Sequence, residues 1–254
     1  MYTDGGAFDG QGLEAIAHYY NANLQWHKGG MEGVYTLKNH TAGSDRFGAY
    51  REGAAALDVE RGVVSQIRKD PFQTDTCIGQ WFYWEGFKYK TAREVVHLFT
   101  DIVSKNGNMV LSIPQLPDGM IDSQEESIVD DFALWTAIHG EAIFGSRPWK
   151  AHGEGPAATP GGMFSERTMK PFTAADLRFT TKGDKLYVFC LGWPEKDVMV
   201  QSLGKKSELG RRKIEHVRVL GSEEKVTWAV EDEGLRIARP QHRPSELTLA
   251  FEIG

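Results

Sequence analysis

The chain changes character near residue 150. Up to about residue 149, signals for helices and strands alternate, which implies parallel strands joined by crossover helices. From about residue 150 onward only strand signals follow, separated by turns such as Lys182-Gly183-Asp184, and such a series predicts an antiparallel β-sandwich. Because 254 residues are enough for two ordinary domains, we predict one domain at residues 1–149 and a second at 150–254.

The first half offers few strands. A helix-like stretch at 18–26 stops at Gly29-Gly30, a strand candidate covers 33–38, and small and polar residues at 40–56 predict a loop. A short apolar strand at 109–113 ends at Pro114. The order agrees with a doubly wound sheet or with part of a (β/α)8 barrel, and neither would be complete.

Two capping boxes predict where later helices begin. Thr91 and Glu94 form the first, and its helix ends at Asn106-Gly107. Ser123 and Glu126 form the second, and Gly140 is the predicted end of that helix. The stretch 153–162, rich in Gly, Pro and Ala, predicts a linker or surface loop. Further strands are predicted at 185–193, 198–202, 214–220, 225–230 and 245–253.

Composition excludes several classes of partner. The net charge is −6, and the densest basic run, Arg211-Arg212-Lys213, adjoins a predicted turn, so no nucleic acid or other polyanion is expected. No run of about 18 apolar residues predicts a membrane span. Cys77 and Cys190 show no metal spacing, and we expect both to be free thiols.

The chain opens on Tyr2-Thr3-Asp4, which has the pattern of a strand ending in a carboxylate, and Gly5-Gly6 then allow a sharp turn. Barrel enzymes keep their catalytic groups at the carboxyl ends of strands. Since only Met1 precedes this motif, we expect the sequence to begin in the middle of a catalytic domain.

Carboxylates in predicted loops are the chemical candidates. They are Asp4, Glu60 and Asp75, and an aromatic run at 81–84 follows. Two carboxylates beside an aromatic platform suffice for a glycosidase, in which one acid attacks and the other donates a proton. Each has a structural alternative: a turn or cap for Asp4, an ion pair with Arg61 or another cation for Glu60, a loop cap for Asp75, and core or interface packing for the aromatic run.

Longer strings, in the same order along the chain, resemble the α-L-fucosidases of glycoside hydrolase family 29, in their bacterial branch. They are Tyr2-Thr3-Asp4-Gly5-Gly6, Ala17-His18-Tyr19-Tyr20-Asn21, Leu57-Asp58-Val59-Glu60-Arg61-Gly62, Gln73-Thr74-Asp75-Thr76-Cys77-Ile78-Gly79-Gln80-Trp81, Ser104-Lys105-Asn106-Gly107-Asn108 and Phe144-Gly145-Ser146-Arg147-Pro148-Trp149. The string Phe172-Thr173-Ala174-Ala175-Asp176 is similar to the start of that family's C-terminal sandwich.

The resemblance implies a partial (β/α)8-like barrel followed by an antiparallel β-sandwich, an α/β fold class. It implies a retaining exo-α-L-fucosidase that removes terminal fucose from fucosylated oligosaccharides or glycoconjugates through a covalent fucosyl-enzyme, with no metal or organic cofactor. Oligomeric state stays open. The family's barrel starts with strands and paired histidines upstream of the nucleophile, and those are absent from this sequence. We therefore expect an N-terminally truncated chain.

The resemblance also assigns roles to four residues. Asp4 takes the place of the nucleophile, and Glu60 takes that of the acid/base. In other branches the acid/base lies in a Trp-Glu string whose counterpart here is Phe72-Gln73, and Gln73 has no titratable proton. Trp81 resembles an aromatic residue of the sugar pocket, and Lys38 stands where the family places a cationic sugar contact.

Two other readings stay open at this level. The chain could be a non-catalytic carbohydrate-binding or scaffold remnant in which only the sandwich folds. It could also be a glycosidase with a different sugar specificity.

Overall fold

A computed structural model describes residues 1–4, 9–38, 53–209 and 213–254 of the chain. The predicted turn at Gly5-Gly6, most of the predicted loop at 40–56 and the arginines of the basic run at 211–213 lie outside these residues. The described chain forms two compact units. The first unit contains Met1–Thr76, Asn106–Leu111 and Thr159–Thr168, and the second contains Cys77–Lys105, Ser112–Ala158 and Met169–Gly254.

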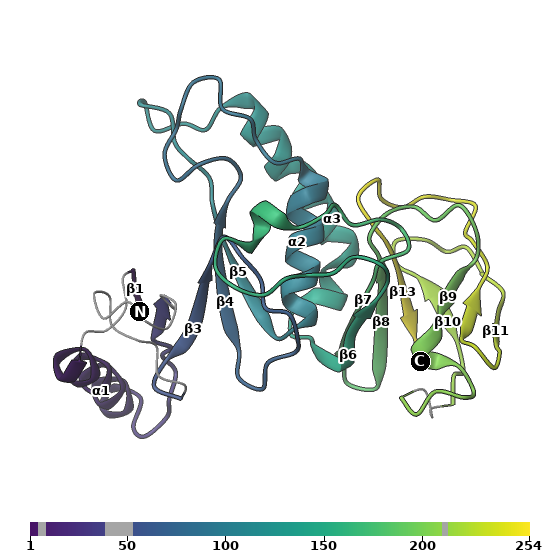
Figure 1. Cartoon of the computed structure of the whole chain (residues 1–254), viewed down its shortest axis with the longest axis horizontal. Coiled ribbons are helices and arrows are strands. Elements are labelled where there is room, and N and C mark those ends of the chain that lie inside the picture. Colours follow the sequence, from purple (N-terminus) through teal and green to yellow (C-terminus); the bar gives the residue numbers. More distant parts are fainter. Residues whose placement is uncertain (5–8, 39–52, 210–212) are drawn as a thin grey trace. The chain divides into compact units, whose positions relative to one another are not determined.

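The first unit is built on a five-stranded sheet in the order β1-β2-β3-β4-β5 (Figure 1). Its strands are β1 (Tyr2–Thr3), β2 (Thr36–Lys38), β3 (Ala56–Glu60), β4 (Phe72–Cys77) and β5 (Gly107–Ser112). The pairs β1–β2, β2–β3 and β3–β4 are all parallel. The carboxyl ends of these four strands therefore meet at one edge of the sheet, as in the barrel half that the sequence predicts.

The strands alternate between an apolar and a polar face. On β3, Leu57 and Val59 point to one face, while Asp58 and Glu60 point to the other. Helix α1 (Asp9–Trp26) supplies the apolar partner, since its Ile16 belongs to a buried cluster with Leu37 of β2. The polar face carries the side chains that form the site described below.

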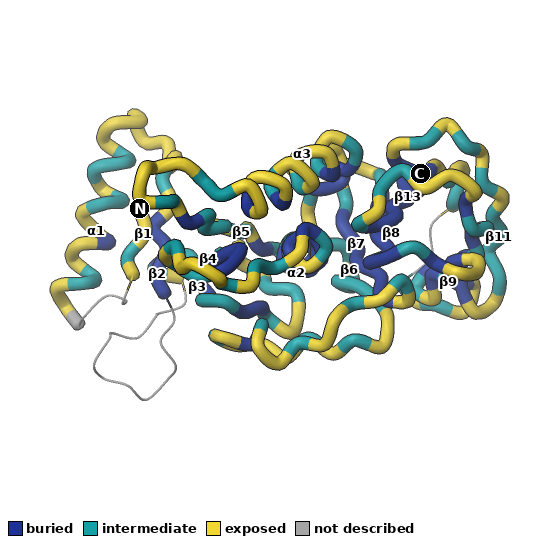
Figure 2. Tube along the Cα trace, turned by 90° about the horizontal axis from the view of Figure 1, so that it is seen from above, coloured by how far each residue is buried: buried dark blue, intermediate teal, exposed yellow. Residues whose placement is uncertain are grey.

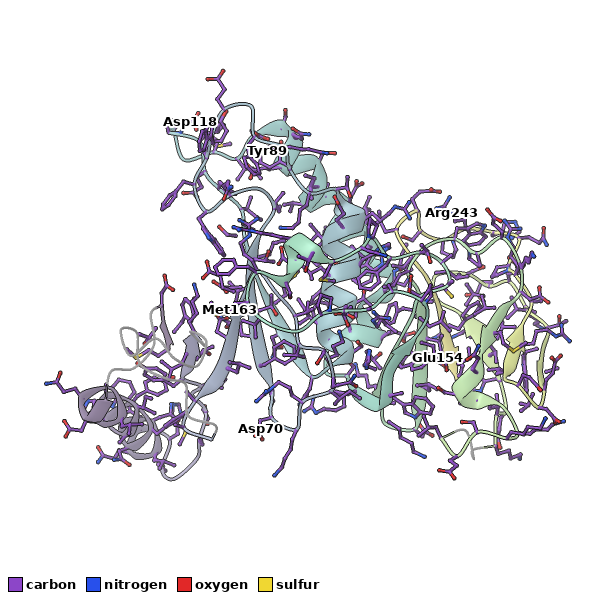
Figure 3. All side chains as sticks on the ribbon, viewed as in Figure 1. Asp70, Tyr89, Asp118, Glu154, Met163 and Arg243 are labelled. Carbon is purple, nitrogen blue, oxygen red and sulfur yellow. The ribbon has the colours of Figure 1, made fainter. Side chains whose placement is uncertain are left out.

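A segment distant in sequence holds the end of β3. The amide of Phe164 donates to the carbonyl of Glu60 over 2.8 Å, and the amide of Val63 donates to Oγ of Ser165 over 3.1 Å. Met163, labelled in Figure 3, belongs to this segment. The predicted linker or surface loop at 153–162 is confirmed for 155–161, which form neither helix nor strand, whereas Gly153 and Glu154 belong to strand β6 and Thr159–Thr168 pack in the first unit.

Glycine at position 62 is required by this packing. A Cβ atom there would collide with the backbone carbonyl oxygen of Gly162, which cannot move aside as a side-chain tip could. Two backbone segments, about 100 positions apart in sequence, can therefore approach closely because position 62 carries no side chain, and Gly162 has a φ of +121° that favours glycine.

The helices of the second unit begin and end at well-defined caps. Helix α2 (Ala92–Ser104) starts with the predicted capping box, in which Thr91 and Glu94 bond reciprocally. Helix α3 (Ser123–Ile143) departs from prediction twice. Asp122, one residue before the predicted Ser123, is its N-cap and accepts from the amides of Gln124 and Glu125.

Gly140 does not end helix α3, which continues to Ile143. Ala142 and Ile143 are buried in the cluster between the helices and the sandwich, and this burial outweighs the weak helix propensity of a single glycine, about 1 kcal/mol. The helix ends instead at Phe144, and Gly145 follows with φ of +73°.

The sandwich consists of a sheet in the order β10-β13-β8-β7-β6 and a smaller sheet in the order β11-β12-β9. Its strands are β6 (Arg147–Glu154), β7 (Leu177–Lys182), β8 (Lys185–Cys190), β9 (Val198–Val200), β10 (Val217–Val219), β11 (Trp228–Val230), β12 (Leu235–Ile237) and β13 (Leu249–Ile253). Two short 3-10 helices, η1 (Ser165–Thr168) in the first unit and η2 (Gln201–Leu203) in the second, complete the elements. All the pairings given for the sandwich strands are antiparallel.

Strand β8 of the larger sheet is covered on both faces, which explains its run of apolar residues after Lys185 and its burial in Figure 2. Leu186 and Val188 of β8 pack into the cluster between the two sheets, while Tyr187 and Phe189 pack against α2 and α3. A strand buried on both sides needs apolar residues at every position, without the polar alternation of a half-exposed strand.

The sequence predicts some of the sandwich strands correctly and misses others. Predicted strands at 185–193, 198–202, 214–220, 225–230 and 245–253 all contain an observed strand, whereas β6, β7 and β12 were missed.

Cys77 and Cys190 are buried free thiols, as predicted. Within the described residues, helices are all too short or too polar to cross a bilayer. The parallel half-barrel sheet and the antiparallel sheets after it confirm the predicted fold class.

Candidate active site

Polar side chains gather where the parallel strands end. In register, Lys38 pairs with Asp58, Asp58 pairs with Gln73, and Glu60 pairs with Asp75. Since side chains two apart on a strand share a face, Asp58 and Glu60 point the same way on β3. The same rule places Gln73 with Asp75 on β4, and Asp4 follows directly after the end of β1.

Lys38 is the centre of this arrangement. Its ammonium nitrogen lies 2.7 Å from Oδ1 of Asp4, 3.1 Å from Oε2 of Glu60 and 3.2 Å from Oδ2 of Asp75. The lysine side chain is only 5% exposed, so these contacts form in a poorly solvated place where ion pairs are strong. One buried cation therefore draws together carboxylates from three strands.

The contacts with Lys38 set the separation of the two predicted catalytic acids. Because both oxygens touch the same nitrogen, Oδ1 of Asp4 and Oε2 of Glu60 are no further apart than the two contacts laid end to end, about 6 Å. The side chain of Asp4 is 72% exposed and that of Glu60 is 15% exposed. Asp4 is thus open to a molecule arriving from solvent, while Glu60 is enclosed.

A second layer lies beneath the lysine. The amide Nε2 of Gln73 donates to Oδ1 of Asp58 over 2.7 Å, and the hydroxyl of Tyr2 lies 3.4 Å from Oδ2 of Asp58 and 3.2 Å from Oδ2 of Asp75. Asp58 is fully buried and Asp75 is 6% exposed. Substrate cannot reach Asp58, so its effect on chemistry is exerted through its neighbours.

Burial and charge shift the acid–base properties of this layer. Burial raises the pKa of Asp58 to about 8, helped by the hydrogen bond and the charge of Asp75 and opposed by Gln73 and Lys38. Burial and the charges of Asp58 and Asp75 raise the pKa of Tyr2. Burial alone would lower the pKa of Lys38, but its hydrogen bonds to Asp4, Tyr2 and Glu60 and the charge of Asp75 hold that pKa above its ordinary value. The lysine therefore stays a cation throughout the physiological range.

Three of the four residues predicted for the site come together: Asp4, Glu60 and Lys38. Trp81 belongs to the second unit, where it lines an open groove of about 500 Å³. The other lining residues are Phe82, Tyr83, Ser112, Ile113, Pro114, Gln115 and Pro117. Phe82 and Trp84 are 84% and 70% exposed, which excludes core packing for both.

The sequence interpretation missed Asp58 and Tyr2 and misplaced Asp75. Asp75 was predicted in a loop, but it lies inside strand β4 and is bonded to Lys38. The signal was available in the strings Asp58-Val59-Glu60 and Gln73-Thr74-Asp75, where polar residues alternate with residues buried on the other face. In the part of the chain that the structure describes, no three His, Cys, Asp or Glu side chains form a group suited to a metal ion.

Parallel strands with acids at their carboxyl ends, followed by an antiparallel sandwich, define a barrel-type enzyme architecture. Sequence comparison gives the family. The family model described as Alpha-L-fucosidase matches residues 2–141, and the one described as Alpha-L-fucosidase C-terminal domain matches residues 170–253. The chain belongs to the alpha-L-fucosidase family.

Individual relatives agree with this assignment. Tissue alpha-L-fucosidase of Homo sapiens is 28% identical over 159 residues, which are 62% of this chain and 29% of that protein. The crystal structure of Thermotoga maritima alpha-fucosidase in complex with fucose has a TM-score of 0.69 and 20% identity, covering 98% of this chain and 50% of that one. A GH29 alpha-L-fucosidase of Bacteroides thetaiotaomicron, solved as a trapped covalent intermediate, has a TM-score of 0.68 and 16% identity, covering 100% of this chain and 55% of that one. The chain thus spans about half the length of these solved relatives.

Proposed function

We propose that the chain carries the two catalytic carboxylates of a retaining exo-α-L-fucosidase, an enzyme that releases terminal α-L-fucose from fucosylated oligosaccharides or glycoconjugates. The observation that carries the proposal is the shared contact of Asp4 and Glu60 with the Lys38 ammonium. It keeps Oδ1 of Asp4 and Oε2 of Glu60 within about 6 Å of each other, which agrees with the close approach of the two carboxyl groups, roughly 5–5.5 Å, in retaining glycosidases.

Asp4 is the nucleophile in this proposal. Its carboxylate oxygen forms a bond to the anomeric carbon of fucose as the bond from that carbon to the aglycone oxygen breaks, and Glu60 gives its proton to the departing oxygen. Glu60 then takes a proton from water, whose oxygen attacks the same carbon and releases Asp4. Two inversions give net retention, and the exposure of Asp4 agrees with attack on an arriving sugar.

Lys38 and Trp81 bind the sugar in this proposal. The lysine offers a fixed positive charge beside Asp4, from which its N–H groups can donate hydrogen bonds to sugar oxygens and stabilise negative charge that develops on them. Trp81 offers the apolar face of its ring to the sugar. We assign residues 1–149 to the catalytic part and residues 150–254 to the sandwich domain.

Two relatives support the proposal. The Thermotoga maritima enzyme was solved with fucose, and the Bacteroides thetaiotaomicron enzyme was trapped as a covalent intermediate with 2-fluoro-fucosyl fluoride. Both share the fold of this chain, and a covalent intermediate is what a nucleophile at Asp4 would form.

Hydrolysis of an aryl α-L-fucoside tests the proposal. Proton NMR should show α-L-fucose as the first-formed anomer, and Asp4→Gly should abolish turnover. Asp70→Asn, an exposed change in the same unit (Figure 3), should leave turnover as it is. If β-L-fucose forms first, the retaining mechanism is wrong. If Asp4→Gly hydrolyses the fucoside as fast as the unaltered chain, the assignment of the nucleophile is wrong.

A further inference from the structure

The side chains of Asp58 and Asp75 meet beneath Lys38. They belong to the neighbouring strands β3 and β4, and Oδ2 of each carboxyl group lies within 3.4 Å of the Tyr2 hydroxyl. Asp58 has no exposed surface and Asp75 retains 6%. Two acids that meet in so little water disfavour each other's ionised form.

Hydrogen-bond donors are too few for both groups to be ionised. Gln73 donates to Oδ1 of Asp58, and Lys38 bonds to Oδ2 of Asp75. Tyr2 has one proton for two acceptors. Among the described residues nothing bonds to Oδ1 of Asp75, although this atom is buried. Buried polar atoms are nearly always paired, so the orphaned oxygen calls for a proton that Gln73, Lys38 and Tyr2 do not supply.

The balance of charges around Lys38 also favours one proton on the pair Asp58 and Asp75. Lys38 contacts Asp4, Glu60 and Asp75, and Asp58 lies opposite it in register. If all four acids were ionised, one ammonium would face four negative charges. A single proton held between Asp58 and Asp75 removes one of these charges and adds one donor to a pair that is short of donors.

We propose that Asp58 and Asp75 share one proton and act as a positioning pair, which holds the Lys38 ammonium between Asp4 and Glu60. Asp75 anchors the ammonium from below through its Oδ2, and the proton lets Asp58 lie beside Asp75 without repulsion. Neither residue touches the sugar. Both act through the lysine, so the inference rests on the proposed function for its effect on hydrolysis.

The direction of the pKa shift agrees with this geometry. The groups that face Asp58 are Tyr2 from β1, Lys38 from β2, Glu60 on its own strand, and Gln73 and Asp75 from β4. Asp75 and burial raise the pKa of Asp58 to about 8 against the opposing effects of Gln73 and Lys38. Because the two carboxyl groups are coupled, this pKa describes the loss of the shared proton from the pair.

Loss of that proton should disturb the lysine. Above about pH 8 the pair carries a second negative charge, which attracts the ammonium away from Asp4 and Glu60. Hydrolysis should therefore decline as the pH rises through this value, while Lys38 itself stays charged.

A carboxyl 13C NMR titration of the full chain tests the shared proton without any need for hydrolysis. In the unaltered chain, the Asp58 signal should titrate near pH 8. Asp75→Asn should move this midpoint down by more than one pH unit, and Gln73→Leu, which removes the donor that favours the ionised form, should move it up. Asp70→Asn should leave it in place. Titration of Asp58 below about pH 5, as in an ordinary carboxyl group, would overturn the proposal even if every variant failed to fold.

The pH dependence of kcat/KM on an aryl α-L-fucoside tests the positioning role. The unaltered chain should lose activity with a midpoint near pH 8. Asp58→Asn, which cannot lose a proton, should shift this alkaline limb upward by more than one pH unit, and Asp70→Asn should not. An unchanged limb in Asp58→Asn overturns the role. Absence of hydrolysis at every pH would instead count against the proposed function, and the NMR titration would still decide the shared proton.

Discussion

The ammonium nitrogen of Lys38 lies 2.7 Å from Oδ1 of Asp4, so an exposed carboxylate is tied to a buried cation. The same nitrogen lies 3.1 Å from Oε2 of Glu60. In the proposed reaction this cation fixes the distance between the attacking and the proton-donating groups. A substitution of Lys38 should therefore disturb both groups at once.

Replacing the lysine should therefore affect turnover strongly. Lys38→Met removes the charge but keeps much of the side-chain volume, and we expect kcat/KM on an aryl α-L-fucoside to fall by roughly 10²-fold or more, the usual cost of losing one preorganised electrostatic group. Lys38→Arg keeps the charge with a different geometry and should lose less. Equal turnover in Lys38→Met and the unaltered chain would show that the cation has no part in the reaction.

The close approach of Gly62 and Gly162 gives a prediction about stability. In Gly62→Ala the new methyl group meets the Gly162 carbonyl oxygen, and we expect denaturant unfolding to report a loss of about 1–3 kcal/mol, as for other overpacked sites. Gly10→Ala is the matched control, because no atom lies within 4 Å of its new Cβ and the residue is in helix α1. It should be neutral or stabilising by up to about 1 kcal/mol. If both variants behave alike, the segment from Thr159 does not pack on β3 as described.

A buried ion triad ties helix α2 to strand β7 in the second unit. Oδ2 of Asp101 accepts from Nζ of Lys105 over 2.7 Å, and its Oδ1 accepts from Nε of Arg178 over 2.6 Å. Asp101→Asn removes the negative charge that Lys105 and Arg178 both face and should cost about 3–5 kcal/mol of unfolding free energy. Asp130→Asn, an exposed change on α3, should stay within about 0.5 kcal/mol. A small effect at Asp101 would mean that the triad is open to water.

Buried histidines should make the second unit sensitive to acid. Burial lowers the pKa of His97, His139 and His152 to about 4 in the folded chain. The unfolded chain then binds more protons below about pH 6.5, so stability is fully present above that pH and is lost as the pH falls toward 4.

His139 offers the clearest test of this acid sensitivity. It has no exposed surface, and its ring stacks on Trp135 at 5.0 Å between centroids. His139→Gln should remove up to about 3 kcal/mol of the stability change between pH 6.5 and 4. His242→Gln, whose side chain is 83% exposed, should leave that change in place. A chain equally stable at pH 4 and 6.5 would contradict the buried neutral state.

Some of this fold follows from local sequence. The capping box at Thr91 and Glu94 satisfies backbone groups within four residues, and its prediction was confirmed. The second predicted capping box was wrong by one residue. Asp122 and Ser123 are both suitable N-cap residues, and only the packing of α3 decides which of them caps the helix. Strands β6, β7 and β12 were missed because each combines charged and apolar residues, the alternation in β7 and β12 covers only a few residues, and strand propensity is a weak local signal.

The candidate site could also be predicted only in part, because its residues are brought together by the pairing of strands distant in sequence. Family strings pointed to Asp4, which follows β1, to Lys38 on β2 and to Glu60 on β3, and the register of the sheet brings them together. No spacing along the chain reveals that Lys38 contacts all three of Asp4, Glu60 and Asp75. Asp58 was overlooked because a buried acid with no access to substrate matches no catalytic pattern, and its importance depends on burial and on Asp75.

The central claim is that Asp4 forms a covalent bond to fucose. The most direct measurement is mass spectrometry of the chain after incubation with 2-fluoro-fucosyl fluoride, which slows the second step more than the first. We expect one added 2-fluorofucosyl group on the N-terminal peptide, attached to Asp4 and absent from Asp4→Gly. An adduct on any other residue, or an equal yield of adduct in Asp4→Gly, would contradict it.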